Sequence, residues 1–499
     1  MAPLEEEVLL VQSNGMAEWL KMSLASHSGV CAATRVELPG RFLWRAYRQV
    51  LGRAGVPSTS PLDKTALTWR LMHTLPELLA EPAQAAVFAP VAGFLRAGEA
   101  DRLFQLAERL ADLFDQYQVY RSDWLLAWAA GQDVLLHPAR PAQALPADQR
   151  WQPALWRALL QPLDETERLG IRPLLHQRFL DALAQGRPLA APLPRRVVLF
   201  GMTHVPLPTL QALSALGSHC QVLLAIPNPC RFHWADIIEG RELLQPARQR
   251  RHPLRAGLDL AALPLESLHA HGHPLLAAWG RQGRDFVRQL DAFDEAERAQ
   301  ARFELPRIDL FDEAEVSPDL PLLGQVQAHV RDLLPLTEHP RWPVPADDQS
   351  IVFHIAHSIQ RELEVLHDRL LALLARPPTD GEPALQPRDV VVMLPDIEPA
   401  APAIRAVFGQ YGRGDPRHIP FDIADLSARS SSPLVHALTW VLGLPQQRCS
   451  FSELRDLLEV PAVAARIGLA AEDLPQLTLW MEGAGIRWGL NQAQRGALD

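Results

Sequence analysis

The clearest pattern along the chain is one segment whose two helical faces differ sharply. It covers residues 106–124, LAERLADLFDQYQVYRSDW. Its apolar positions recur at helical spacing and are Leu106, Leu110, Leu113 and Tyr117. Asp112, Asp115 and Gln116 lie three and four residues apart, so they share a second face. The pattern predicts an amphipathic helix that carries a row of hydrogen-bond acceptors.

Short runs of β-branched and other apolar residues predict buried strands. They lie at residues 8–11, 197–201, 222–226, 351–355 and 390–394. Amphipathic helical patterns follow most of these runs. After the fourth run, Ser358 is a suitable helix cap, and the apolar stripe that follows consists of Ile359, Leu363, Leu366 and Leu370. Alternating strands and helices predict an α/β fold with parallel sheets.

Helical periodicity dominates residues 63–182, where we find no convincing strand pattern and a proline-rich break at 132–149. This predicts a large all-helical insertion inside the first α/β domain. That domain would then comprise residues 1–62 and 183–345. The proline-rich segment at 338–348 is the best domain boundary, so residues 346–499 would begin a second α/β domain.

Composition narrows the class of protein. A chain of 499 residues with 48% hydrophobic content can build several cores. Its four cysteines contain no C-x-x-C pair, which argues against a disulfide framework or a structural zinc site. No apolar run approaches the ~20 residues of a membrane helix, and the N-terminus is acidic where a signal peptide is basic. We therefore expect a soluble, cytoplasmic protein without membrane contact.

The net charge of −10 argues against a protein that coats nucleic acid over its whole surface. A local channel for DNA remains compatible with it.

Signatures of several catalytic centres are missing. A P-loop requires G-x-x-x-x-G-K-[ST], and the only Lys-Thr pair, at residues 64–65, lacks both glycines. A two-metal nuclease centre of the P-D…[DE]-x-K type needs a lysine after its carboxylates, and none follows Asp396. His354 and His357 are three residues apart, but satisfied polar packing is favoured over metal ligation for an isolated pair. The sequence predicts no catalytic residue and no metal site.

Three features are suited to nucleic acid, and each has a plainer alternative. Residues 8–25 predict a strand, a tight polar loop and a helix, whose N-terminal amides suit an anion, or simply an α/β turn. The carboxylates of the polar helix face can accept hydrogen bonds from base amino groups, and Arg121 and Arg172 can pair with guanine or phosphate. Such a face more commonly meets water. Trp44 can stack on a base or belong to the core.

Long phrases of the chain resemble the RecC family, the γ subunits of exodeoxyribonuclease V. They include VQSNGMAEWL at 11–20, LPGRFLWR at 38–45, LFDQYQVYR at 113–121, HPLLAAWGRQGRDF at 273–286 and HSIQRELEVLHDRLLALL at 357–374. The resemblance runs nearly end to end. It implies catalytically degenerate, superfamily 1 helicase-like domains: 1A at 1–62 and 183–345, a 1B-like insertion at 63–182, and the start of domain 2, with 2A and the beginning of 2B, at 346–499.

The resemblance also implies a role in DNA repair and recombination. The chain would join RecB-like and RecD-like subunits in a helicase–exonuclease that uses ATP and Mg²⁺, while binding no cofactor itself. It would split double-strand DNA ends, channel the strands and recognise the Chi hotspot in single-stranded DNA. Further family sequence would lie before Met1 and after Asp499, so we expect apolar surface where the second domain stops.

Matching phrases place the Chi-binding positions at Gln12, Asn14, Glu18, Leu38, Trp44, Asp112, Leu113, Asp115, Gln116, Arg121 and Arg172. Asn14 and Glu18 differ from the family pattern, which has threonine and glutamine, so the exact sequence recognised stays open. Two alternative functions also stay open. One is an active superfamily 1 helicase–nuclease subunit whose catalytic motifs lie outside this sequence. The other is a structural scaffold without DNA recognition, in which the Asp112 face is buried against protein.

Overall fold

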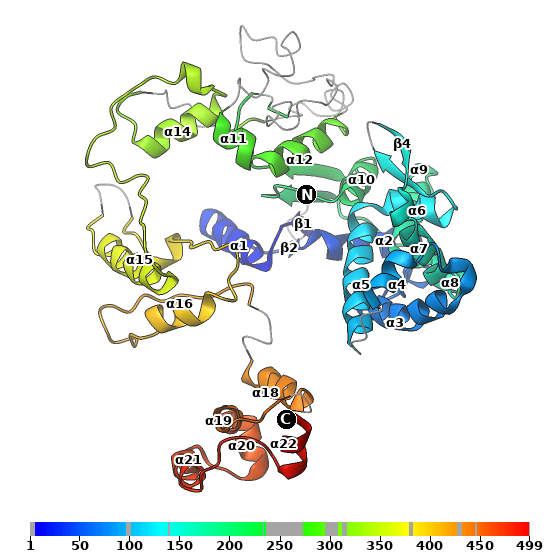
Figure 1. Ribbon diagram of the computed structural model, residues 1–499. Coiled ribbons are helices and arrows are strands. Elements are labelled where there is room, and N and C mark those ends of the chain that lie inside the picture. The colour runs from blue at the N-terminus through cyan, green and yellow to red at the C-terminus, as the bar shows by residue number, and fades with distance from the viewer. Residues whose placement is uncertain are drawn as a thin grey trace. The chain divides into compact units, whose positions relative to one another are not determined.

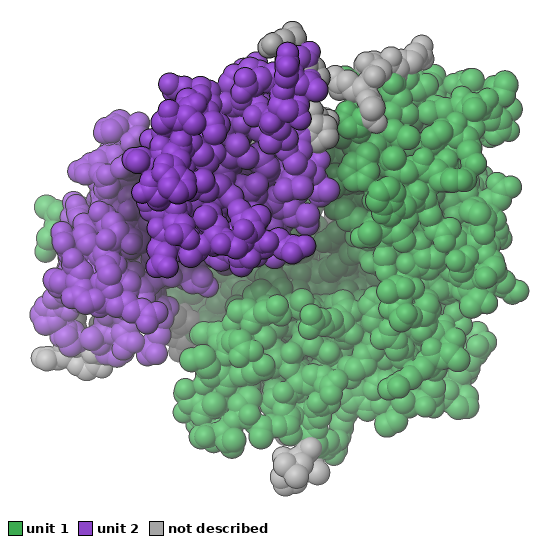
Figure 2. Space-filling model, turned by 90° about the horizontal axis from the view of Figure 1, so that it is seen from below, with its two compact units in different colours: residues 1–350 green, residues 351–499 purple. Residues whose placement is uncertain are grey.

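The computed structural model forms two compact units, Met1–Ser350 and Ile351–Asp499, which Figure 2 colours separately. The structure describes residues 5–95, 101–137, 140–232, 234–235, 273–294, 308–311, 317–378, 383–426, 432–444 and 447–498.

The first unit is organised around a parallel sheet. In the described part of the chain its strand order is β2 (Thr34–Glu37), β1 (Glu7–Leu10), β5 (Arg196–Phe200) and β6 (Gln221–Ala225). Val8 is the partner of both Arg35 and Val197, which fixes the register of the three adjoining strands. The α/β class and the first three predicted strands are confirmed. The sequence did not predict strand β2, because TRVE has a single apolar residue and therefore no apolar run.

Helices cover the two faces of this sheet from different parts of the chain. One face packs against α2 (Pro39–Leu51), α9 (Arg172–Ala184) and α10 (Leu207–Leu216). The other packs against α1 (Asn14–Ser28). Figure 1 shows α1 and α2 on opposite sides of β1 and β2. Successive residues of β1 enter different cores, Val8 the first and Leu9 the second, as the two-residue period of a strand requires.

Residues between α2 and α9 build a second core of their own. Its helices are α3 (Lys64–Ala80), α4 (Ala89–Leu95), α5 (Arg102–Tyr120), α6 (Ser122–Ala129), α7 (Trp151–Leu160) and α8 (Glu165–Leu169). At its centre the fully buried rings of Phe114 and Trp156 stack with centroids 5.6 Å apart, beside fully buried Trp128. The amphipathic helix predicted at 106–124 is confirmed as α5 followed by α6.

The prediction that this insertion is all-helical is wrong. Strands β3 (Val134–His137) and β4 (Arg140–Ala144) form an antiparallel hairpin within the proline-rich break. The indole N–H groups of Trp124 and Trp128 donate to the carbonyls of Leu136 and Val134, at 3.0 and 2.9 Å. Contacts with α6 therefore anchor the hairpin. Its own sequence lacks the alternation of apolar and polar residues that would predict strands.

The rest of the first unit contains α11 (Pro274–Trp279), α12 (Arg281–Asp291) and α14 (Leu322–Arg331). A small core holds this part together, with Cys230, Trp234, Leu276 and Leu333 buried in it.

The described part of the second unit is helical. Its helices are α15 (Ile359–Leu374), α16 (Ala401–Phe408), α18 (Pro433–Leu442), α19 (Phe451–Leu458), α20 (Pro461–Ile467), α21 (Leu474–Gly483) and α22 (Gln492–Leu498). The predicted cap is confirmed, because the Ser358 hydroxyl accepts from the Arg361 N–H at 3.3 Å. The apolar stripe of α15 packs through Leu363 and Leu370 against Phe408.

The strands predicted at residues 351–355 and 390–394 are wrong for this structure, which assigns neither segment to a sheet. Phe353 and Met393 are 87% and 88% exposed. A buried strand needs a neighbouring strand for its backbone groups and an apolar layer for its side chains. An apolar run by itself supplies neither the neighbouring strand nor the apolar layer, so these two segments do not form strands.

The helical core gives a stability prediction. Trp156→Ala should lower the free energy of unfolding by about 3–5 kcal/mol, because it leaves a cavity against Phe114. Urea unfolding followed by circular dichroism measures the change. Trp69→Ala is the matched control: Trp69 is 61% exposed in the same insertion, and its loss should change stability by less than about 0.5 kcal/mol. Equal effects of the two substitutions would refute this assignment of the core.

Candidate nucleic-acid interface

A polar cluster forms where α5 meets the beginnings of α3 and α9. Arg172, the first residue of α9, lies between two carboxylates. Its Nη1 is 3.0 Å from Asp115 Oδ1, and its Nη2 is 2.7 Å from Asp63 Oδ1. Both carboxylates and the guanidinium are about one-third exposed. The fold thus brings two of the predicted positions, Asp115 and Arg172, into direct contact.

A second ion pair continues the cluster along α5. Lys64 Nζ lies 2.6 Å from Asp112 Oδ1, and the Gln116 amide donates to Asp112 Oδ2 at 3.2 Å. The hydrogen bond from Lys64 is the main cause that lowers the pKa of Asp112, and the lysine charge acts in the same direction. The same hydrogen bond raises the pKa of Lys64. Asp112 is therefore a carboxylate at neutral pH and acts only as an acceptor.

Asp63 and Lys64 were not among the predicted site residues. They stand at the start of α3, where Asp63 is the N-cap position. Sequence spacing could not place them beside α5, since helix packing creates that proximity. The one available signal was that Lys64 is one of only two lysines in the chain.

Arg121 and Leu113 lie apart from this cluster. Arg121 follows the last residue of α5, and its guanidinium donates to both Asp123 oxygens, at 3.0 and 2.8 Å. It also donates to the Leu136 carbonyl of the hairpin and lies 3.7 Å from the Trp124 ring centroid. Leu113 packs against the helical core. In this structure Arg121 joins α5, α6 and the hairpin.

Three of the remaining predicted positions, Gln12, Asn14 and Leu38, come soon after strands at the carboxyl edge of the sheet. The other two lie within α1 (Glu18) and α2 (Trp44), which pack on opposite faces of the sheet. Gln12 closely follows β1 and Leu38 follows β2, and these strands are parallel neighbours. Gln12, Asn14 and Glu18 are exposed, while Leu38 is half-buried as the N-cap residue of α2. Such edges are where α/β folds commonly present ligand-binding loops.

Three details near these positions refine the sequence-based interpretation. The hydroxyl of Ser13, the N-cap of α1, accepts from the Met16 N–H at 3.2 Å. Glu18 pairs with Lys21 at 2.9 Å on the helix surface. Trp44 is half-buried against the sheet core and meets Tyr47 edge-on at 6.2 Å. A tryptophan in this position contributes to packing and keeps part of its ring exposed.

A hydrogen-bonded chain inside the first unit connects α2, α9 and α10. The Tyr47 hydroxyl lies 2.9 Å from His176 Nδ1, and His176 Nε2 lies 3.1 Å from Gln211 Oε1. Burial lowers the pKa of His176 and raises the pKa of Tyr47, while the positive charge of Arg172 opposes the shift at tyrosine. One neutral tautomer satisfies both contacts: Nε2–H donates to Gln211, and Nδ1 accepts from Tyr47.

Comparison with known proteins places the chain in a family. A model described as "RecC, N-terminal domain" matches residues 1–333, and one described as "RecBCD enzyme subunit RecC fourth domain" matches residues 431–499. The chain belongs to the RecC family.

Relatives named "RecBCD enzyme subunit RecC" align with almost all of the chain. The relative from Escherichia coli (strain K12) is 37% identical over 98% of this chain and 43% of its own length. The relative from Haemophilus influenzae is 33% identical over 99% of this chain and 44% of its own. That from Mycobacterium tuberculosis (strain ATCC 25618 / H37Rv) is 31% identical, with 99% and 41% covered. The chain spans less than half the length of these RecC relatives.

The described residues contain no candidate metal cluster and no candidate membrane-spanning helix. No group of three or more histidine, cysteine, aspartate or glutamate side chains within them could hold a metal ion. Among the helices described, none is long and apolar enough to cross a membrane.

The ion pair on α5 gives a pH-dependent prediction. Lys64→Gln should raise the pKa of Asp112 toward its ordinary value, because the lysine hydrogen bond is the largest cause of the lowering. A carbon-13 NMR titration of labelled aspartate measures this. In the unchanged chain the ion pair contributes to folding stability at pH values above the ordinary aspartate pKa. That contribution is lost as the pH falls through the lowered pKa of Asp112. Lys21→Gln is the control and should leave Asp112 unchanged; a shift with both variants would contradict the assignment.

The buried chain gives a prediction about stability. Tyr47→Phe should destabilise the fold by about 1–3 kcal/mol, because it leaves the buried His176 Nδ1 without its donor. Thermal unfolding of both variants provides the measurement. Tyr120 is 49% exposed, so Tyr120→Phe is the matched control. Equal melting temperatures for Tyr47→Phe and the unchanged chain would show that this hydrogen bond makes no net contribution.

Proposed function

We propose that this chain is a DNA-binding part of a RecBCD-type helicase–exonuclease, exodeoxyribonuclease V, in the repair of double-strand breaks by recombination. In this proposal it assembles with RecB-like and RecD-like subunits in the bacterial cytoplasm. It splits double-strand ends, channels the strands and recognises a hotspot in single-stranded DNA. The partner subunits use ATP and Mg²⁺, while this chain binds no cofactor and carries no ATPase or nuclease centre.

The observation that carries recognition is the cluster of Asp112, Asp115, Gln116 and Arg172. Its carboxylates are acceptors for the amino groups of adenine, cytosine and guanine, and a guanidinium suits the acceptor edge of guanine. Carboxylates repel phosphate, so this face favours base edges over the backbone. Asp112 remains 41% exposed despite its pairing with Lys64, which leaves it accessible to a base.

The sheet edge supplies the second half of the proposed interface. The exposed amides of Gln12 and Asn14 can donate and accept hydrogen bonds, and the exposed carboxylate of Glu18 can accept them. The partly exposed ring of Trp44 would contact the same single strand of DNA. The proposed DNA-binding positions also include Leu38, Leu113 and Arg121, which the family resemblance implies. Arg121 would contribute indirectly, because it holds α5 and the hairpin in place.

The domain assignment belongs to the same proposal. Residues 1–62 and 183–345 correspond to a helicase-like domain 1A, and residues 63–182 to its 1B-like insertion. Residues 346–499 correspond to the start of domain 2. The parallel sheet and the separate core of the insertion support the first two assignments.

One observation favours a second candidate function, a scaffold without DNA recognition. Arg172 already contacts both Asp63 and Asp115, and a guanidinium with two carboxylates can serve the fold alone. A base that binds here must compete with those contacts. The two functions therefore predict different consequences when the cluster is broken.

The experiment uses the full-length subunit assembled with its RecB-like and RecD-like partners. Asp115→Ala and Arg172→Ala should impair the response to the hotspot and leave unwinding intact. Each lost base contact should cost ~1–3 kcal/mol of discrimination. Cleavage of one long duplex, with and without candidate hotspots, is followed at a fixed salt concentration because backbone binding depends on salt.

Asp181→Ala is the control, since Asp181 is an exposed carboxylate on the same helix as Arg172. This substitution should change neither DNA unwinding nor the response to the hotspot. If the two cluster variants unwind slowly but keep the hotspot response, the scaffold function is correct and recognition by this cluster is refuted.

A further inference from the structure

An exposed pair of aromatic rings lies on the surface where α3 and α5 pack together. Trp69 of α3 and Phe104 of α5 have ring centroids 6.0 Å apart with planes inclined at 46°. They are 61% and 40% exposed. Neither ring belongs to the helical core beneath, whose buried members on these helices include Leu71 and Phe114. The core therefore does not account for the pair.

The aromatic pair lies on the same strip of α5 as the polar cluster. Phe104, Glu108, Asp112 and Asp115 follow one another at spacings of four, four and three residues, which aligns them on one helix face. Helix α3 runs antiparallel beside this strip, because its first residue, Lys64, meets Asp112 while Trp69 meets Phe104. Phe104 and Asp112 are separated by about 12 Å along the helix axis. This is on the order of three to four stacked nucleotides.

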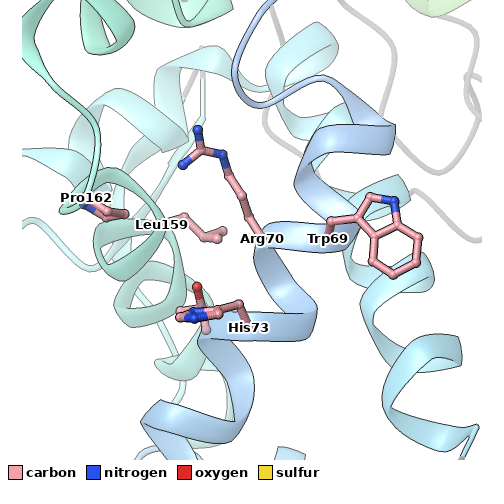
Figure 3. Close-up of a pocket in the computed structure, with 6 residues that line it drawn as sticks. Trp69, Arg70, His73, Leu159 and Pro162 are labelled. Atoms are coloured by element: carbon pink, nitrogen blue, oxygen red, sulfur yellow. The ribbon is translucent and has the colours of Figure 1, made fainter.

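A groove adjoins the aromatic pair on α3. Its volume is about 470 Å³, and its lining consists of Trp69, Arg70, His73, Thr74, Leu159 and Pro162. Figure 3 shows the Trp69 ring on one side of α3 and Leu159 and Pro162 on the other. The lining of the groove mixes apolar surface with hydrogen-bond donors.

The basic side chains of this groove are close to carboxylates. Arg70 Nη2 lies 3.4 Å from Glu167, and His73 Nδ1 lies 3.5 Å from Glu77. The groove therefore has little net positive charge to attract phosphate. A nucleic-acid strand would gain its affinity here from stacking on the rings, which tolerates any base.

We propose that Trp69 and Phe104 form a stacking platform for the bases of a single-stranded nucleic acid that continues along α5 from the Asp112–Asp115 cluster. This inference rests on the proposed function and adds a sequence-independent contact to it. The continuity of the rings with carboxylate acceptors that suit base edges favours a nucleic-acid strand. A protein partner is the other kind of occupant for exposed rings, and the experiment separates the two.

The test is photo-cross-linking on the assembled full-length complex. Single-stranded oligonucleotides carry one 5-iododeoxyuridine, moved one position at a time, and mass spectrometry identifies the linked peptide. We expect a link to Trp69 or Phe104 from iodouracils a few positions away from those that link to the α5 cluster. Links to α5 without any link to these rings, at every position tested, would overturn the platform and leave the proposed function standing. If no oligonucleotide links to the chain at all, both proposals fail.

Binding of the same oligonucleotides provides the quantitative readout. Trp69→Ala should weaken binding about tenfold without changing its salt dependence, because no phosphate contact is lost. Trp69→Phe should retain part of the affinity. Trp279, 82% exposed on α11, gives the matched control Trp279→Ala, which should bind normally. Unchanged affinity in Trp69→Ala would refute the platform, and loss of a partner subunit from this variant would show that the rings anchor protein instead.

Discussion

The packing of α9 between two cores is the constraint on which the arrangement of the first unit depends. Leu175 and Phe179 of this helix are buried in the sheet core, while Ile171 just before it is buried in the helical core. An α-helix presents different faces to different neighbours at fixed angles. Because both cores hold the same rigid element, the insertion cannot reorient without exposing apolar surface. The start of α9 is thereby fixed at the junction, and Arg172 with it.

Electrostatics at this junction depend on that packing. An exposed ion pair such as Lys64–Asp112 contributes little to stability because solvent screens it, so it does not hold the helices together. The apolar contacts determine where the charges lie, and the charges then determine the chemistry of the surface. The contact of Arg172 with two carboxylates leaves a site rich in acceptors. Binding there is an exchange of partners, in which a ligand must replace contacts that the chain already makes.

The two ends of the α5 strip have different chemical properties. At one end, Asp112 and Asp115 offer directional hydrogen bonds, which distinguish one base edge from another. At the other, Trp69 and Phe104 offer ring surface, which any base can use. A DNA strand that contacts both ends would be held by the rings whatever its sequence. The carboxylates would distinguish its bases at only a few positions. Under the proposed function, the stacking contact would not stop the passage of sequence that the polar cluster does not recognise.

Sequence alone determined the features whose causes are local. The amphipathic period of α5, the Ser358 cap and the apolar run of β1 follow from residues near one another in the chain. Local phrases also carried the family resemblance, which the family comparison confirmed. Tertiary structure decided where partners come from distant segments. Strand β2 and the β3–β4 hairpin exist because neighbours complete their hydrogen bonds, whereas the apolar run at 351–355 has no such neighbour in the described structure. Asp63 and Lys64 joined the cluster for the same reason: helical periodicity predicts which face a side chain occupies, and only packing decides what that face meets.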